Sequence, residues 1–141
     1  MIKGYKITNN GIGKNNIKYE VGNTYTTSDM NIHYCKNIDN VFKYYDYDKK
    51  IKIYEIEAYE SIHDLYQSVT TKLKVVREVL SSEYNLLFKR YKFDNHNNMI
   101  KHIFRNGNTE SWQYDNHNNM IEHVFWNIIT TIIREDLEND R

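Results

Sequence analysis

Hydrophobic and polar residues alternate along most of the chain, and this period of two favours strands over helices. The alternation is clearest over residues 51–58, where an apolar or aromatic residue repeatedly follows a charged one. Shorter stretches with the same pattern lie between turns rich in Asn and Gly. In the first part of the chain we therefore predict strands at residues 4–8, 17–21, 32–35 and 51–58.

Two segments instead place apolar residues at helical spacing. Over residues 38–45 the apolar residues are Ile38, Val41, Phe42 and Tyr45, with Asp39 as a plausible helix cap. Residues 61–69 begin with Ser61, which has Asp64 in the position of a capping box. We predict a short helix in each. Residues 71–80 fit a strand or a helix equally well.

The second part of the chain contains an internal repeat. Asp94 to Ile100 recurs letter for letter as Asp115 to Ile121, a period of 21 residues, and residues 93–106 match residues 114–127 at 10 of 14 positions. Each copy begins with an Asp-Asn-His-Asn-Asn cluster, which is typical of turns because Asn and Asp accept left-handed backbone angles. We predict strands on both sides of each cluster, at residues 89–94, 99–105, 109–115 and 120–127, with a hairpin turn at residues 106–108.

These patterns predict an α+β fold in which strands dominate. Residues 1–88 form a small module with short strands and one or two small helices. Residues 89–141 form a four-stranded antiparallel meander from two repeats of 21 residues, followed by a C-terminal extension. We expect the two parts to pack as one unit.

Composition narrows the classes of function. The 141 residues carry 19 basic and 19 acidic side chains, so electrostatic steering toward nucleic acid is disfavoured. The single cysteine excludes an intramolecular disulfide and is typical of a reducing cytoplasm. The N-terminus lacks the apolar core of a secretory signal, and the longest weakly polar run, residues 124–133, is too short to span a bilayer. We expect a soluble cytoplasmic protein with no membrane partner.

The first part of the chain resembles a family of uncharacterised small domains encoded mainly by phages and prophages. The resemblance covers residues 3–80 and rests on YEVGNTY at residues 19–25, HYCKN at 33–37, VFKYY at 41–45 and KLKVVRE at 72–78. It implies an accessory protein of a phage or mobile element, acting in the cytoplasm of the host cell, but it implies no particular reaction.

The repeats at residues 89–127 resemble tyrosine-aspartate (YD) repeats. Phe93-Asp94 and Tyr114-Asp115 occupy the signature positions, and Asn98 and Asn119 stand where a Gly-Asn turn is usual. In phage proteins such repeats form β-rich surfaces attached to unrelated domains. The resemblance implies architecture rather than chemistry.

Three enzymatic or metal-binding hypotheses arise from the sequence. His33 and Cys35 lie two residues apart, but the sequence supplies no third group that would orient the base, so a buried thiol beside a packed histidine is favoured over Cys–His catalysis. A nucleotide-using transferase similar to ADP-ribosyltransferases would use His33, Glu55 and Glu57. The repeat histidines lie on strands about 10 Å apart, too far for one zinc ion. We predict no cofactor and no metal.

The interpretation that we favour is a non-enzymatic protein that binds a host protein or complex, such as a defence complex that it would inhibit. Tyr, Trp and Arg dominate protein interfaces. A single-stranded nucleic-acid binder with an aromatic and basic sheet face is a further alternative. The predicted binding residues are Arg105, Trp112, Trp126, Tyr44, Tyr45 and Tyr47.

Overall fold

The computed structural model describes residues 1–127. It divides the chain into two compact units, Met1–Leu87 (unit 1) and Phe88–Arg141 (unit 2). The C-terminal extension expected after residue 127 lies outside the described residues. None of the helices within residues 1–127 is long and apolar enough to cross a membrane.

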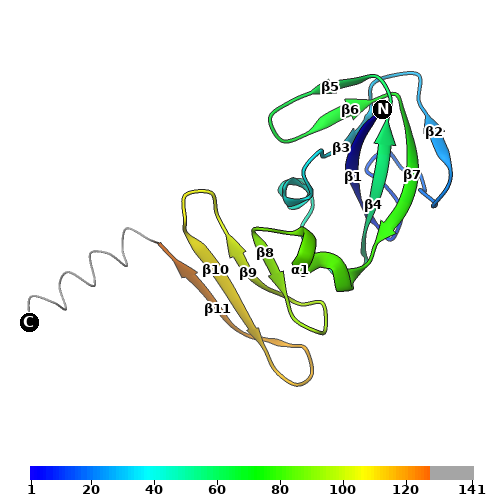
Figure 1. The fold of residues 1–141 in the computed structure, drawn as a ribbon. Helices are drawn as coiled ribbons and strands as arrows, with labels where there is room; N and C mark the ends of the chain where they lie inside the picture. Colours follow the sequence, from blue (N-terminus) through cyan, green and yellow to red (C-terminus); the bar gives the residue numbers. More distant parts are fainter. Residues whose placement is uncertain (128–141) are drawn as a thin grey trace, which may run out of the picture. The chain divides into compact units, whose positions relative to one another are not determined.

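Strands make up most of both units (Figure 1). Unit 1 contains β1 (Ile2–Asn9), β2 (Thr24–Thr26), β3 (Ile32–Tyr34), the 3₁₀ helix η1 (Ile38–Lys43), β4 (Ile51–Ala58), β5 (Ser61–His63), β6 (Ser68–Thr70), β7 (Lys72–Val79), the 3₁₀ helix η2 (Ser81–Glu83) and α1 (Tyr84–Leu87). Unit 2 contains β8 (Tyr91–Phe93), β9 (Met99–Ile103), β10 (Thr109–Tyr114) and β11 (Met120–Trp126).

Unit 1 is built from two antiparallel sheets with the strand orders β1-β4-β7-β2 and β3-β6-β5. The two sheets meet where Tyr5 of β1 and Cys35, just after β3, exchange backbone hydrogen bonds of 2.7 and 2.9 Å. Gly4 permits this approach, because a Cβ there would lie 2.6 Å from the Tyr34 ring and 2.8 Å from the carbonyl oxygen of Cys35. The crossing fixes β3 against the outer edge of β1.

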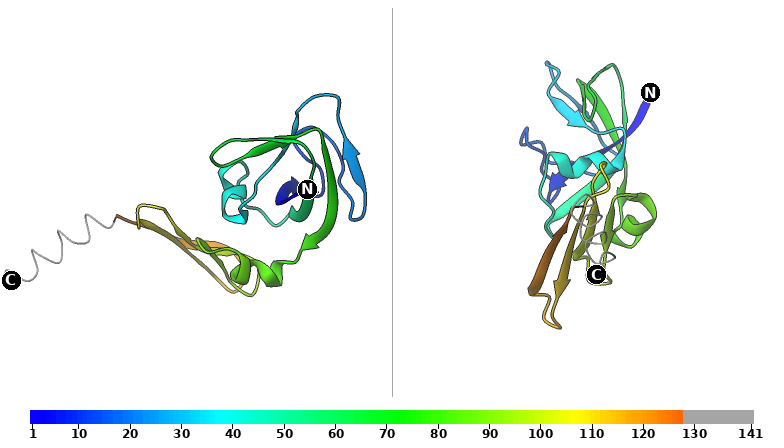
Figure 2. Two further views of the ribbon diagram at one scale, coloured as in Figure 1. Left: turned by 45° about the horizontal axis from the view of Figure 1, so that its top comes forward. Right: turned by 90° about the vertical axis from the view of Figure 1, so that its left-hand side faces the viewer.

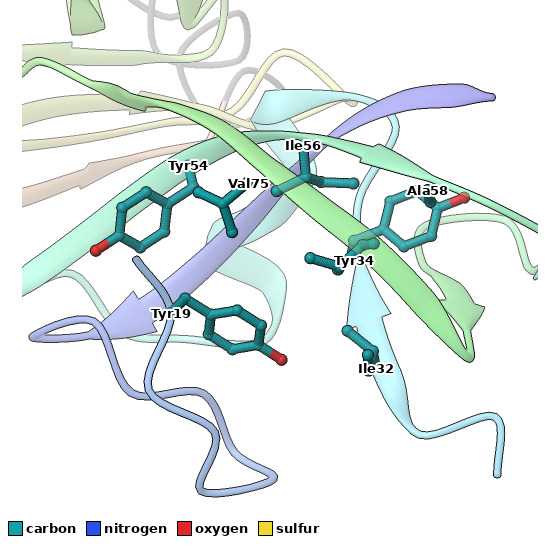
Figure 3. Packing of buried hydrophobic residues seen from close by; sticks show 8 residues of the cluster. Tyr19, Ile32, Tyr34, Tyr54, Ile56, Ala58 and Val75 are labelled. Carbon is teal, nitrogen blue, oxygen red and sulfur yellow. The ribbon is translucent and has the colours of Figure 1, made fainter. Parts of the chain in front are cut away.

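A cluster of buried side chains fills the space between these sheets (Figure 3). Tyr19 and the β3 residues Ile32 and Tyr34 reach toward residues of β4 and β7. The hydroxyl of Tyr34 donates to Ser61 at 2.8 Å, so its polar atom has a partner. The remaining members of the cluster are Tyr54, Ile56, Ala58, Leu73 and Val75.

Unit 2 is the predicted four-stranded antiparallel meander, with the strand order β11-β10-β9-β8. The left view of Figure 2 shows its strands as one thin, twisted layer. Both repeat turns use the expected geometry. Asn97 and Asn118 have φ values of 64° and 62°, and the side chains of Asp94 and Asp115 accept backbone hydrogen bonds two and four residues ahead.

The structure is mainly β, so the predicted α+β class overstated the helices. The strands predicted at residues 4–8, 32–35 and 51–58 and in the repeats are confirmed, residues 71–80 contain β7, and residues 38–43 are helical. The cap of η1 is Asn37 rather than Asp39, because the Asn37 side chain accepts from the backbone N–H of Asp39 at 3.0 Å.

The helix predicted over residues 61–69 is wrong, because this segment forms the hairpin of β5 and β6. Its buried side chains are polar: Thr70 donates to the carbonyl of Tyr59 at 2.7 Å, whereas Ile62 and Leu65 are 63% and 73% exposed. The helical spacing of apolar residues in this segment therefore did not identify the side chains that are buried. The strand predicted at residues 17–21 is also wrong, since only an isolated bridge at Lys18 forms there.

Candidate functional site

A cavity of about 300 Å³ lies in unit 1, along the edge of β1 that faces away from β4. Its walls come from β1, β3 and the loops at residues 14–15 and 44–45, and none of the lining residues belongs to β4. We call it the β1 cavity. The side chains in its wall that carry chemistry are Lys6, Lys14, His33, Cys35, Tyr44 and Tyr45.

Lys6 is the most unusual of these residues, because its side chain is charged and only 6% exposed. It lies on the inward face of β1 together with Gly4 and Thr8, opposite Tyr54 of β4. Its Nζ donates to the carbonyl oxygen of His33 at 2.6 Å. Burial, with a further contribution from the charge of Lys14, lowers the pKa of Lys6 to about 8.

Lys14 holds the loop after η1 in place on the other side of the cavity. Its Nζ donates to the carbonyl oxygen of Tyr44 at 2.8 Å and lies 4.9 Å from the centre of the Tyr45 ring. Tyr44 and Tyr45, both predicted as binding residues, therefore line the β1 cavity. Tyr47 does not, because it packs edge-on against Phe42 with ring centres 5.7 Å apart.

His33 and Cys35 both line the cavity but differ in environment. His33 is exposed over most of its surface, and partial burial of its ring together with the charges of Lys6 and Lys14 lowers its pKa. Cys35 is buried, and burial raises the pKa of its thiol to about 11. A thiol with so high a pKa is a poor nucleophile.

The structure places Glu55 and Glu57 apart from His33. Both glutamates lie on the face of β4 opposite the one that carries Tyr54, and neither lines the β1 cavity. The carboxylate of Glu55 accepts from Arg77 at 2.9 Å, and Arg77 also donates to Glu83 at 2.8 Å. The three residues of the transferase alternative do not converge on one cavity.

The remaining predicted binding residues lie in unit 2. Trp112 stacks on His123 of β11, with ring centres 5.2 Å apart and planes 3° apart. Trp112 also lines an open hollow of about 700 Å³, together with Lys92 and Lys101. Arg105 is exposed in the turn that joins β9 and β10, and Trp126 is 49% exposed near the end of β11.

Strand β11 is an edge strand within the described residues, because its one neighbour there is β10. Four of its seven residues are large apolar side chains that are about half exposed or more. They are Met120 (58%), Ile121 (64%), Phe125 (55%) and Trp126 (49%). No comparable cluster was predicted, since only Trp126 was singled out from the sequence.

Residues 2–87 match the family described as a domain of unknown function, DUF7666. The chain belongs to this family. The match spans the whole of unit 1 except its first residue and includes every residue that lines the β1 cavity. No curated protein and no solved structure matches the chain. The β1 cavity is therefore a feature of the DUF7666 domain, and the repeats lie outside it.

Sequence reasoning missed Lys6 and Lys14 in the DUF7666 domain. In the sequence, Lys6 is one of several lysines in an alternating strand, and alternation places it with Gly4 and Thr8 on what reads as a polar face. The crossing of β3 over Gly4 and the loop that carries Gly13 and Tyr19 bury that face. The one sequence signal for the burial of Lys6 was that two small residues, Gly4 and Thr8, share its face of the strand.

Proposed function

We propose that the protein is a non-enzymatic accessory protein that acts by binding another protein, and that β11 accepts an extended segment of this partner as an additional antiparallel strand. The observation that carries the proposal is the edge of β11, which is open within residues 1–127, together with its exposed apolar side chains. An open sheet edge supplies backbone hydrogen bonds, and the flanking side chains supply specificity.

The internal repeat supports this role for β11. The pairing of Trp112 with His123 in the second copy is equivalent to the pairing of Tyr91 with His102 in the first, 21 residues earlier. Both pairs are stacked rings, and a register irregularity follows at the same position in each copy. Strand β11 is thus a structural copy of β9.

The two copies differ in what lies on their second edge. Residues 101–103 of β9 pair with residues 109–111 of β10. The equivalent residues of β11, 122–124, have no such neighbour within residues 1–127. The repeat therefore indicates that an added strand would pair with residues 122–124 of β11. By analogy with β10, the added strand would have alternating polar and apolar residues.

Natural proteins protect open edges with Lys, Pro, bulges or short strands. Strand β11 has seven residues and contains neither Lys nor Pro, and its one register irregularity lies at its start, so residues 122–126 pair regularly with β10. With zero formal net charge, long-range steering is weak, so contact depends on packing and on backbone pairing. These features favour a protein partner over a nucleic acid.

The proposal extends to the setting and the partner. The resemblance of residues 3–80 to phage and prophage domains supports an accessory protein of a phage or mobile element, which works in the host cytoplasm. The partner is then a host protein complex, such as a defence complex that the protein inhibits, and the repeats of unit 2 serve as a YD-type binding surface. This part of the proposal rests on the resemblances alone.

The test combines capture with a mapped interface. Tagged full-length protein is used to isolate partners from host cells, and the candidate partner is then purified and titrated against three proteins: the wild type, Ile121→Lys/Phe125→Lys, and the control Ile62→Lys/Leu65→Lys. The control replaces two apolar residues of similar exposure in unit 1. Hydrogen exchange of the β11 amides is measured with and without the partner.

We expect the β11 variant to bind at least tenfold more weakly, the control to bind like the wild type, and the amides of residues 122–124 to gain protection in the complex. Equal binding by both variants, or a complex that leaves the β11 amides unprotected, would refute the proposal.

A further inference from the structure

We infer that the β1 cavity of the DUF7666 domain binds a small anionic ligand that carries a planar ring. The anionic group meets the ammonium groups of Lys6 and Lys14, and the ring lies among the tyrosines of the wall. This inference concerns unit 1 and is independent of the protein interface proposed on β11.

The first argument is the charge of Lys6. Lys6 is only 6% exposed, and it lines the cavity. The carbonyl oxygen of His33 satisfies only one of its three N–H donors, and no aspartate or glutamate lines the cavity. Buried charges in proteins are normally paired or bound to a ligand. An anion in the cavity supplies the missing partner.

The neighbours of Lys6 strengthen this argument. Lys14 lines the same cavity and is a second cation rather than a counter-ion. The thiol of Cys35 stays protonated at neutral pH, and the imidazole of His33 is never anionic there, so neither is a counter-ion for Lys6. Cation–π contact with the Tyr19 ring, at 5.6 Å, offsets only part of the cost of burying an ammonium group.

The second argument is an open backbone position in the wall. Tyr5 and Asn9 direct their backbone groups away from β4, to Cys35 and Ile12. Alternate residues of a strand point their backbone groups to the same side, so Ile7, which lies between them, also points to this side. No protein group in residues 1–127 hydrogen-bonds the backbone of Ile7, and Ile7 lines the cavity.

The third argument is the shape and chemistry of the wall. Tyr5, Tyr44 and Tyr45 line the cavity and are only partly buried, so their rings offer surface on which a flat group can pack. The N–H and C=O of Ile7 suit the donor and acceptor edge of a heterocycle or an amide. A volume of about 300 Å³ is at the lower end for small-molecule sites. Nucleoside monophosphates and aromatic carboxylates share this chemistry.

The test titrates full-length protein by calorimetry and by two-dimensional NMR. The probes are AMP, UMP and 4-hydroxybenzoate, with inorganic phosphate and the neutral nucleosides adenosine and uridine as comparisons. The variants are Lys6→Met, Lys14→Met and the control Lys18→Met, whose lysine is exposed and does not line the cavity. The NMR spectrum of each variant reports whether it is folded.

We expect at least one ring-bearing anion to bind saturably at a one-to-one ratio and to shift the amide signal of Ile7. Its affinity falls at least tenfold in Lys6→Met and at least threefold in Lys14→Met, and it is unchanged in Lys18→Met. If Lys6→Met does not fold, Lys14→Met decides. Failure of every anion to bind the wild type, equal binding by the neutral nucleosides, or unchanged affinity in the folded cavity variants would overturn the inference.

Discussion

The two units of this chain use β-structure in different ways. In unit 1, two sheets enclose a cluster in which Ile56, Leu73 and Val75 are completely buried. In unit 2, the strands β9, β10 and β11 contain no residue that is fully buried within residues 1–127. Unit 1 is stabilised by a core between layers. Within residues 88–127, unit 2 has buried aromatic residues only at its start, and its other strands are held by their hydrogen-bond ladder, ring stacks and repeated turns. These buried aromatic residues are Phe88, Tyr91 and Phe93.

This difference separates the two kinds of site. A cavity with a buried charge needs surrounding layers that exclude water, and only unit 1 provides them around Lys6. A surface that adds a strand needs an open edge, and within residues 1–127 β11 has one. The two proposals follow this division, with a small ligand in the DUF7666 domain and a protein partner on the meander.

The largest expected effect tests the contrast between core and layer. Ile56→Ala removes a completely buried side chain from unit 1, so we expect it to lower the free energy of unfolding by about 3 kcal/mol. Val124→Ala, in the half-buried part of β11, should cost less than about 1 kcal/mol. Urea titration followed by NMR, with the amides of each unit scored separately, measures both. Equal losses would contradict the contrast.

The second prediction concerns the buried charge of Lys6. Its pKa of about 8 is below the ordinary value of 10.5, so folding disfavours its charged form by about 3 kcal/mol at neutral pH. The hydrogen bond to the carbonyl oxygen of His33 returns about 1–2 kcal/mol. Lys6→Met should therefore raise the free energy of unfolding by about 1–2 kcal/mol at pH 7. A loss of stability would indicate a structural lysine instead of a ligand-binding one.

The pH dependence of this difference follows from the sign of the shift. Between pH 8 and 10.5 the unfolded chain binds a proton on Lys6 that the folded protein has released, so wild-type stability rises with pH relative to Lys6→Met. Cys35 acts in the opposite direction above pH 9, because its folded pKa is raised to about 11. Both proteins contain Cys35, so its effect cancels in the comparison. The amount by which Lys6→Met exceeds the wild type in free energy of unfolding should therefore shrink between pH 8 and 10.5, as measured by chemical denaturation. An advantage independent of pH would contradict the shift.

Sequence patterns predicted the parts of the fold that local chemistry determines. The Asp-Asn-His-Asn-Asn turns and the meander followed from residue types such as Asn97 and Asn118, which adopt left-handed angles. The hairpin of β5 and β6 was mistaken for a helix because its inward side chains include the hydroxyl of Thr70, which carbonyl oxygens satisfy. Period and polarity cannot show such long-range satisfaction.

The site shows the same limit. Tyr44, Tyr45 and His33 were singled out from the sequence and do line one cavity, but the lysine that gives the cavity its charge was not. The burial of Lys6 depends on tertiary contacts with β3, through the carbonyl oxygen of His33, and with the loop that carries Gly13 and Tyr19. The exposure of Ile121 and Phe125 depends likewise on tertiary packing, because nothing in the described chain covers these side chains on the faces of β11.

The third prediction compares the two copies of the repeat turn. Asn98 is 5% exposed, and its Nδ2 donates to Asp94 and to Asn118, both at 3.1 Å. Asn119 is exposed, and its Nδ2 makes one longer contact of 3.4 Å to Asp115. We expect Asn98→Ala to cost about 1 kcal/mol and Asn119→Ala a few tenths. Thermal unfolding of the two variants measures this, and equal costs would show that the copies are energetically equivalent.

The smallest expected effect separates the binder from the transferase alternative. Glu55 pairs with Arg77 at the surface, where the side chains are 32% and 40% exposed, and such pairs contribute little to stability. Glu55→Gln/Glu57→Gln should lower the free energy of unfolding by no more than about 1 kcal/mol and leave partner binding unchanged. Trp126→Ala/Arg105→Ala, which alters unit 2, should instead weaken partner binding. The opposite outcome is a glutamine variant that stays folded and binds the partner but loses the protein's biological activity. The activity would then be enzymatic, and unit 1 would perform the chemistry instead of only holding a ligand.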